Sequence, residues 1–137
     1  MITIEKATLS DLDHLTKIDH LPEQALEDSV KRGFVYTAKK DGKIFGLLRY
    51  SLFWQTIPFL DLIFLEKEFR CGGIGSRMLE KWEDDMASLG YQNLMTSTQS
   101  DESAYLFYEK HGFRKCGSFF PPDQKVEEWI YRKTIKK

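Results

Sequence analysis

The sequence feature that most constrains this chain is a glycine-rich segment between an apolar run and an amphipathic stretch. Residues 59–65 (FLDLIFL) are almost continuously apolar, which is typical of a central strand covered on both faces. Gly72, Gly73 and Gly75 follow soon after. Apolar residues then recur with the 3.6-residue period of a helix, at Met78, Leu79, Trp82, Met86 and Leu89, and Gly90 ends the pattern. A buried strand that turns through glycines into a helix predicts a domain of the α/β class.

The other elements follow from similar patterns. We expect further strands at residues 2–8, 34–38, 43–53, 91–98, 113–120 and 126–134. We expect further helices after a Ser10-Asp11 cap, from Pro22 to Gly33, and from Ser100 or Asp101 through His111. The Asp41-Gly42 pair predicts a hairpin turn, and Pro58 predicts a break before residue 59. The resulting order, βααβββαβαββ, predicts a mixed α/β sheet with helices on both sides.

Length and composition restrict the class of protein further. A chain of 137 residues suits one domain, residues 1–137. Its net charge of −1 at pH 7 provides no basic field for nucleic acid. We expect no membrane span, because no apolar run approaches the ~20 residues that one requires. The N-terminus lacks a leader pattern and cysteines number only two, so we expect a cytoplasmic protein. The three histidines lack ligand spacing, so we expect no metal site.

The glycine segment has the composition of an anion-binding loop. The N–H groups at a helix N-terminus carry partial positive charge, and glycines let the backbone fold closely around a pyrophosphate. Arg70, Arg77 and Lys81 can add contacts to outer phosphates. The alternative is a tight strand-to-helix turn without a ligand. A Walker-type loop is disfavoured because no Lys-Ser or Lys-Thr follows Gly75, and the glycine spacing differs from that of a Rossmann dinucleotide site.

Two motifs in order resemble those of one enzyme family. Arg70-x-x-Gly73-x-Gly75 after an apolar strand resembles the acetyl-CoA signature of the GNAT superfamily of N-acetyltransferases. The segment Ala104-x-x-Phe107-Tyr108-Glu109-Lys110-x-Gly112-Phe113 is similar to its second hallmark. The predicted element order also matches that fold, with its mixed, mostly antiparallel central sheet, from about residue 2 to residue 135. The resemblance therefore covers nearly the whole chain.

The resemblance implies acetyl-CoA as co-substrate and a set of residues that bind it. Backbone N–H groups of the loop would hold the pyrophosphate, which assigns Cys71, Gly72, Gly73, Ile74, Gly75 and Ser76 in addition to Arg70. The main chains of Phe64 and Leu65 would contact the pantetheine arm, and an N–H near Leu65 would polarise the thioester carbonyl. Asp101 stands where many members have asparagine, so we place it at the cofactor without an inferred amide contact.

The family chemistry is direct attack of a neutral amine on the thioester. Tyr108 matches the tyrosine that gives a proton to the departing thiolate, and its alternative is a packing aromatic. Two carboxylates are candidates for the general base. Asp61 interrupts an apolar strand, where desolvation would raise its pKa, and Glu66 follows the strand end. The alternatives are a paired or solvated Asp61, a solvated Glu66, and a chain of water molecules in place of both.

These patterns lead to one leading function and two competing ones. We expect an N-acetyltransferase that moves acetyl from acetyl-CoA to a primary amine on a small molecule, peptide or protein. The first alternative is a non-catalytic acyl-CoA-binding sensor or interaction module, and the second is a purely structural domain. Tyr50, Phe53, Trp54 and Phe59 suit a core, a pocket or a dimer surface, so the sequence leaves a homodimer open.

Overall fold

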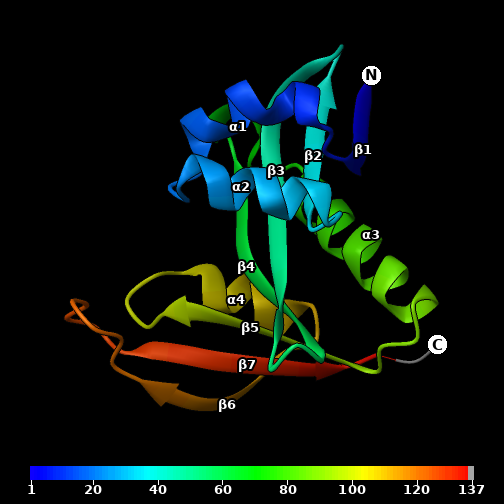
Figure 1. Cartoon of the computed structure of the whole chain (residues 1–137). Coiled ribbons are helices and arrows are strands. Elements are labelled where there is room, and N and C mark those ends of the chain that lie inside the picture. Colours follow the sequence, from blue (N-terminus) through cyan, green and yellow to red (C-terminus); the bar gives the residue numbers. More distant parts are fainter. Residues whose placement is uncertain (136–137) are drawn as a thin grey trace. The chain divides into compact units, whose positions relative to one another are not determined.

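The order of elements along the chain agrees with the sequence prediction. The structure is a computed structural model that describes residues 1–135 (Figure 1). Its strands are β1 (Ile2–Lys6), β2 (Val35–Lys40), β3 (Lys43–Phe53), β4 (Ile57–Leu65), β5 (Asn93–Gln99), β6 (Arg114–Phe119) and β7 (Glu128–Thr134). Its α-helices are α1 (Leu12–Ile18), α2 (Glu23–Lys31), α3 (Ile74–Ser88) and α4 (Ala104–Lys110). Short 3₁₀ helices at Leu9–Asp11 and Lys67–Phe69 complete the described chain. The predicted order βααβββαβαββ is confirmed.

The strands form one mixed sheet of seven strands in the order β1-β2-β3-β4-β5-β7-β6. The pairs β1–β2, β2–β3, β5–β7 and β6–β7 are antiparallel, whereas β4 and β5 are parallel. The recorded pairing of β4 with β5 is short and joins Phe59 to Met95 and Leu60 to Thr96. The fold class predicted from the sequence is therefore confirmed, including its mostly antiparallel pairing.

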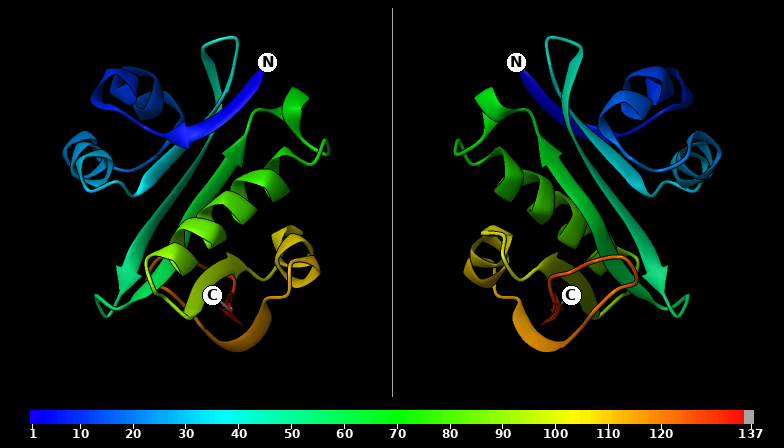
Figure 2. Two further views of the ribbon diagram at one scale, coloured as in Figure 1. Left: turned by 90° about the vertical axis from the view of Figure 1, so that its right-hand side faces the viewer. Right: turned by 90° about the vertical axis from the view of Figure 1, so that its left-hand side faces the viewer.

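Chain contacts divide the protein into two compact units. The first comprises residues 1–51 and 62–82, and the second comprises residues 52–61 and the chain from Glu83 onward. In the first unit, α1 and α2 lie on one side of β2 and β3, and the beginning of α3 lies on the other side (Figure 2). Buried side chains from these helices and strands form its core, among them Leu15, Leu26, Val30, Val35, Ile44 and Leu47.

The second unit has its own set of buried side chains. The strands β5 and β7 pair along their full lengths, from Asn93 with Thr134 to Gln99 with Glu128. Large side chains that are buried here include Leu60, Met86, Leu94, Tyr108, Phe113 and Tyr131. Burying apolar side chains contributes ~1.5–3 kcal/mol each, so these residues stabilise this unit. The ring of Tyr108 on α4 packs against those of Phe113 and Tyr131.

Three local predictions need correction. Pro58 lies inside β4 and not before it, because proline is tolerated near the start of a strand. The run 59–65 is only partly buried, whereas complete cover was expected. The helix α4 begins at Ala104 and not at a cap on Ser100 or Asp101. The reason is that the Ser100 N–H donates to the Glu127 carbonyl at 2.8 Å, which commits this backbone to a strand-like contact.

Candidate functional site

The glycine segment connects β4 to α3 within the first unit. Cys71 and Gly73 adopt left-handed backbone conformations, with φ of 65° and 82°. The first helical hydrogen bond runs from the Arg77 N–H to the Gly73 carbonyl at 3.1 Å, so the N–H groups of residues 74–76 precede the helical ladder. A Cβ atom added to Gly72 or Gly73 would meet no heavy atom within 4 Å. The backbone of this turn is thus open to an approaching anion, and a side chain would fill the space that the anion needs.

Arg70 binds back to the strand that precedes the loop. Its Nε donates to the Leu65 carbonyl at 2.8 Å, and its guanidinium carbon lies 5.9 Å from the centre of the Phe64 ring. In the structure the Arg70 side chain ties the loop to the end of β4. The contact that Arg70 could add to an outer phosphate stays a prediction.

At the end of β4, the main-chain N–H and C=O groups of successive residues face opposite edges of the strand. The Glu66 N–H donates to the Phe45 carbonyl of β3 at 2.8 Å. Since main-chain groups alternate between the two edges of a strand, those of Phe64 also face β3, and those of Ile63 and Leu65 face the opposite edge. The position of the Phe64 carbonyl oxygen is consistent with this orientation, because it lies 2.8 Å from where a Cβ atom added to Gly46 of β3 would be. Ile63, which the sequence did not indicate, therefore shares an edge with Leu65.

Tyr108 lies on α4 in the second unit and is 5% exposed. Its ring packs against Phe107, Phe113 and Tyr131, at centroid distances of 5.6, 5.8 and 6.5 Å. Burial raises the pKa of the Tyr108 phenol, while a side-chain hydrogen bond with Thr96 lowers it and nearby carboxylates raise it. The net shift is upward, so the phenol keeps its proton at neutral pH and can serve as a donor.

The other predicted site residues have different surroundings. Asp61 is exposed, whereas its apolar neighbours led us to expect a carboxylate shielded from water. Asp101 is exposed in the turn before α4. Glu66 is partly buried just after β4. The general base therefore stays a prediction, with Asp61, Glu66 and a chain of water molecules as the candidates.

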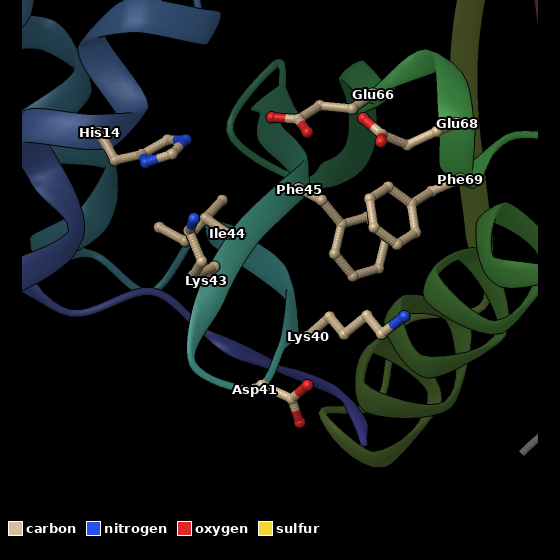
Figure 3. Close-up of a pocket in the computed structure, with 9 residues that line it drawn as sticks. All are labelled: His14, Lys40, Asp41, Lys43, Ile44, Phe45, Glu66, Glu68 and Phe69. Atoms are coloured by element: carbon tan, nitrogen blue, oxygen red, sulfur yellow. The ribbon is translucent and has the colours of Figure 1, made fainter.

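Glu66 lines a cavity of about 510 Å³ in the first unit. Figure 3 shows its carboxylate and that of Glu68 beside the stacked rings of Phe45 and Phe69, whose centroids are 3.9 Å apart. The remaining wall comes from His14, Lys40, Asp41, Lys43 and Ile44. Residues 70–76 of the glycine segment are not among the residues that line it. This mixed-charge cavity is therefore distinct from the open turn described above.

The aromatic residues near the β3–β4 turn divide between core and surface. Tyr50 is buried in the first unit, with its ring 5.7 Å from that of Trp82. In the second unit, Trp54 is 78% exposed and its ring lies 4.8 Å from that of Phe53, which in turn is 5.9 Å from Phe59. Core packing thus accounts for Tyr50, and a dimer surface at Trp54 stays a prediction.

Among the residues that the structure describes, no three or more His, Cys, Asp or Glu side chains are grouped as metal ligands. No helix in the described part of the chain has the length and apolar character needed to cross a membrane.

The fold and a family comparison define the chain as an acyltransferase. The model of the acetyltransferase (GNAT) family matches residues 4–113, and the chain belongs to this family. The family uses acetyl-CoA. A comparison with proteins of curated function found no match.

Three solved structures share this fold over almost their whole length. A GNAT-family acetyltransferase from Bacillus cereus is 27% identical, with a TM-score of 0.80, covering 100% of this chain and 99% of that protein. The ribosomal-protein-S18-alanine N-acetyltransferase of Escherichia coli is 18% identical, with a TM-score of 0.83 and coverage of 100% and 96%. The PaiA N-acetyltransferase of Thermoplasma acidophilum, solved in complex with coenzyme A, is 17% identical, with a TM-score of 0.83 and coverage of 98% and 99%.

Proposed function

We propose that this protein transfers an acetyl group from acetyl-CoA to the primary amine of an acceptor, and that residues 1–137 act as a single catalytic domain. The observation that carries the proposal is the open glycine turn at the start of α3, where Gly72 and Gly73 leave room beside backbone N–H groups. Membership of the GNAT family supports the same acetyl-transfer function. A pyrophosphate is the anion that such a turn suits.

The pyrophosphate would be held mainly by main-chain groups. The residues proposed for this role are Cys71, Gly72, Gly73, Ile74, Gly75 and Ser76. The left-handed conformations of Cys71 and Gly73 support it, because consecutive N–H groups in such a turn converge on one point. Arg70 would act on this site indirectly, since its bond to Leu65 fixes the start of the turn.

The pantetheine arm would lie along the edge of β4 that faces away from β3. We assign Ile63 and Leu65 to this contact, because their main-chain groups point to that edge. Phe64, which the sequence also predicted, would contribute its side chain and not its main chain. An N–H of Ile63 or Leu65 would donate to the thioester oxygen, where negative charge develops during attack.

The transfer needs two proton movements. The amine nitrogen forms a bond to the thioester carbon, and the bond from that carbon to sulfur breaks. Tyr108 would give its phenolic proton to the departing sulfur, a role that its protonated state at neutral pH supports. The proton of the attacking amine would pass to Asp61, to Glu66 or to water, and Asp101 would remain at the cofactor edge.

A kinetic experiment tests this function. Release of free thiol from acetyl-CoA is followed with a panel of polyamines, aminoglycosides, amino acids and peptide N-termini. We expect rapid release with at least one amine class. Tyr108→Phe should then lower kcat about 100-fold, the lower range for general acid–base catalysis, with acetyl-CoA affinity unchanged. The dependence of kcat on pH is then measured for Asp61→Asn and for Glu66→Gln. The variant that loses the fall in kcat at low pH identifies the general base.

The main alternative is a non-catalytic acyl-CoA-binding module. The exposure of Asp61 favours it, because the sequence expected a general base shielded from water at this position. Tight binding of acetyl-CoA without thiol release across the whole amine panel would support this alternative and contradict transferase activity.

A further inference from the structure

The mixed-charge cavity of the first unit is surrounded by charged side chains that do not pair with one another. Its wall carries the ammonium groups of Lys40 and Lys43 and the carboxylates of Asp41, Glu66 and Glu68. Of these five groups, only the Asp41 carboxylate has an ion-pair partner in the described chain, which is the N-terminal ammonium group of Met1 at 2.9 Å. Two carboxylates and two ammonium groups therefore surround one cavity without an ion-pair partner.

The unpaired charges are separated by sign across the cavity. Figure 3 shows the carboxylates of Glu66 and Glu68 on one side of it. Lys43 and the ring of His14 lie on the other side. The backbone that carries the carboxylates is attached to β3, because the Glu66 N–H donates to the Phe45 carbonyl at 2.8 Å. Since Lys43 is the first residue of β3, the positive and the negative wall belong to one connected part of the fold.

An aromatic surface lies between the charged walls. Phe69 is only partly buried, and its ring stacks on the buried ring of Phe45. The Lys40 ammonium group lies 6.0 Å from the centre of the Phe69 ring, so its positive charge also stays at the cavity. A volume of about 510 Å³ is within the range of ~300–1,000 Å³ that is usual for small-molecule pockets. A ligand with a short apolar chain can therefore pack on Phe69 while its polar groups reach the charged walls.

The balance of charge decides which class of ligand the cavity suits. A ligand that carries only a positive charge would pair with the carboxylates but would also approach Lys40 and Lys43, and a purely negative ligand would meet the converse repulsion. A molecule with one ammonium group and one carboxylate satisfies both walls through charge-assisted hydrogen bonds.

We propose that the mixed-charge cavity is a binding site for a small zwitterion of the amino-acid class. The carboxylates of Glu66 and Glu68 bind its ammonium group, Lys43 and the N–H of His14 bind its carboxylate, and its apolar chain packs on Phe69. This site is separate from the proposed transfer site. The cavity includes residues of β3, whereas the main-chain groups proposed to contact pantetheine face the edge of β4 that points away from β3. The proposal therefore goes beyond the transferase function and does not rest on it.

Calorimetric titration of the wild-type protein, without acetyl-CoA, tests the class of ligand. The probes are two isomeric zwitterions, L-norleucine and 6-aminohexanoate, together with pentylamine and hexanoate. Removing the carboxylate from either isomer gives pentylamine, and removing the ammonium group gives hexanoate, so the four probes differ only in the charges they carry and in their spacing.

The expected result is preference for the doubly charged probes. We expect the better zwitterion to bind with a dissociation constant of about 1 mM or lower, as befits a ligand of this size. Pentylamine and hexanoate should each bind at least about tenfold more weakly, because each lacks one charge-assisted contact. A smaller difference for either analogue, or weaker binding of both zwitterions than this, overturns the proposal.

Substitutions on the two walls test the assigned contacts. Glu68→Gln removes one carboxylate and Lys43→Gln removes one ammonium group, and each should weaken binding of the better zwitterion at least about threefold. Glu66 stays unchanged because it is a candidate general base. The matched controls are Glu23→Gln on α2 and Lys17→Gln on α1, since both side chains are exposed in the same unit and neither lines the cavity. A smaller loss in either cavity variant, or equal losses in the controls, overturns the proposal.

Nuclear magnetic resonance of the wild type locates the bound probe. As the better zwitterion is added, the ring signals of His14 and Phe69 should shift and give the dissociation constant found by calorimetry. Saturating acetyl-CoA should not displace the zwitterion, because residues 70–76 do not line the cavity. Ring signals that stay unchanged, or displacement of the zwitterion by acetyl-CoA, would overturn the assignment of this cavity.

Discussion

The Nε of Arg70 donates a hydrogen bond of 2.8 Å to the main-chain carbonyl of Leu65, the last residue of β4. This bond closes the chain between the strand end and the start of the glycine turn. Through this hydrogen bond, Arg70 fixes the backbone of the turn, and this role does not depend on the positive charge of its side chain.

Substitution of Arg70 separates geometry from charge. Arg70→Lys keeps the positive charge but loses the planar Nε–H donor, whereas Arg70→Gln loses both. If the bond to Leu65 is what matters, both variants should weaken acetyl-CoA binding by similar factors, about three- to tenfold, the scale of one exposed hydrogen bond. Isothermal titration calorimetry measures the two dissociation constants. Near wild-type affinity in Arg70→Lys, with a large loss in Arg70→Gln, would assign Arg70 to direct phosphate contact.

Gly73 should matter to the ligand as well as to the fold. Its φ of 82° is unfavourable for any residue with a Cβ atom, so Gly73→Ala should lower the unfolding free energy by about 1 kcal/mol. The added methyl group also occupies the open face of the turn, and we expect acetyl-CoA affinity to fall at least tenfold. Gly90→Ala is the control, since Gly90 has a φ of 96° and likewise no atoms within 4 Å of an added Cβ. Comparable losses of affinity in the two variants would contradict the assigned pyrophosphate site.

Gly46 of β3 controls the position of the β4 end. A Cβ atom on Gly46 would lie 2.5 Å from Leu65 Cδ2 and 2.8 Å from the Phe64 carbonyl oxygen. Gly46→Ala should therefore displace this part of β4, lower the unfolding free energy by about 1–3 kcal/mol, and weaken acetyl-CoA binding. In β6, Gly117→Ala places its new Cβ in open space and should change neither quantity appreciably. Chemical denaturation and calorimetry on both variants check this, and an unaffected Gly46→Ala protein would contradict the close approach of Phe64 and Leu65 to Gly46.

The stability of the second unit should depend on pH in the alkaline range. Burial and a hydrogen bond from the Tyr131 hydroxyl to Glu109, 2.8 Å long, raise the pKa of Tyr131 to about 12. Because the folded pKa exceeds the unfolded value of about 10, the contribution of this phenol is complete below pH ~10 and is lost as the pH rises towards 12. Tyr131→Phe should flatten the fall in unfolding free energy between these pH values. An equally steep fall in that variant would show that other groups cause it.

The sequence was most informative where local chemistry alone decides the structure. The Asp41-Gly42 pair predicted a hairpin, and both residues have positive φ values, 50° and 84°, as a two-residue turn requires. The succession of apolar strand, glycines and periodic helix placed the turn before α3, because each part carries its own period or its own steric requirement.

The sequence was least informative where the answer depends on which strand lies beside which. Asp61 was expected to be desolvated because its neighbours are apolar, but it is exposed on a strand whose recorded pairing with β5 stops at Leu60. The choice between Ile63 and Phe64 needs the register of β4 against β3, and a one-residue shift reverses it.

In the proposed function, main-chain nitrogens of the turn at residues 70–76 bind the pyrophosphate of acetyl-CoA. The most direct measurement is calorimetric titration of the folded wild-type protein with acetyl-CoA and, in parallel, with S-acetylpantetheine, which lacks the pyrophosphate and the nucleotide. We predict saturable binding of acetyl-CoA in the micromolar range and binding of S-acetylpantetheine at least 100-fold weaker, a difference of about 2.7 kcal/mol. Equal affinity for the two ligands, or no heat with acetyl-CoA at millimolar concentration, would contradict the claim.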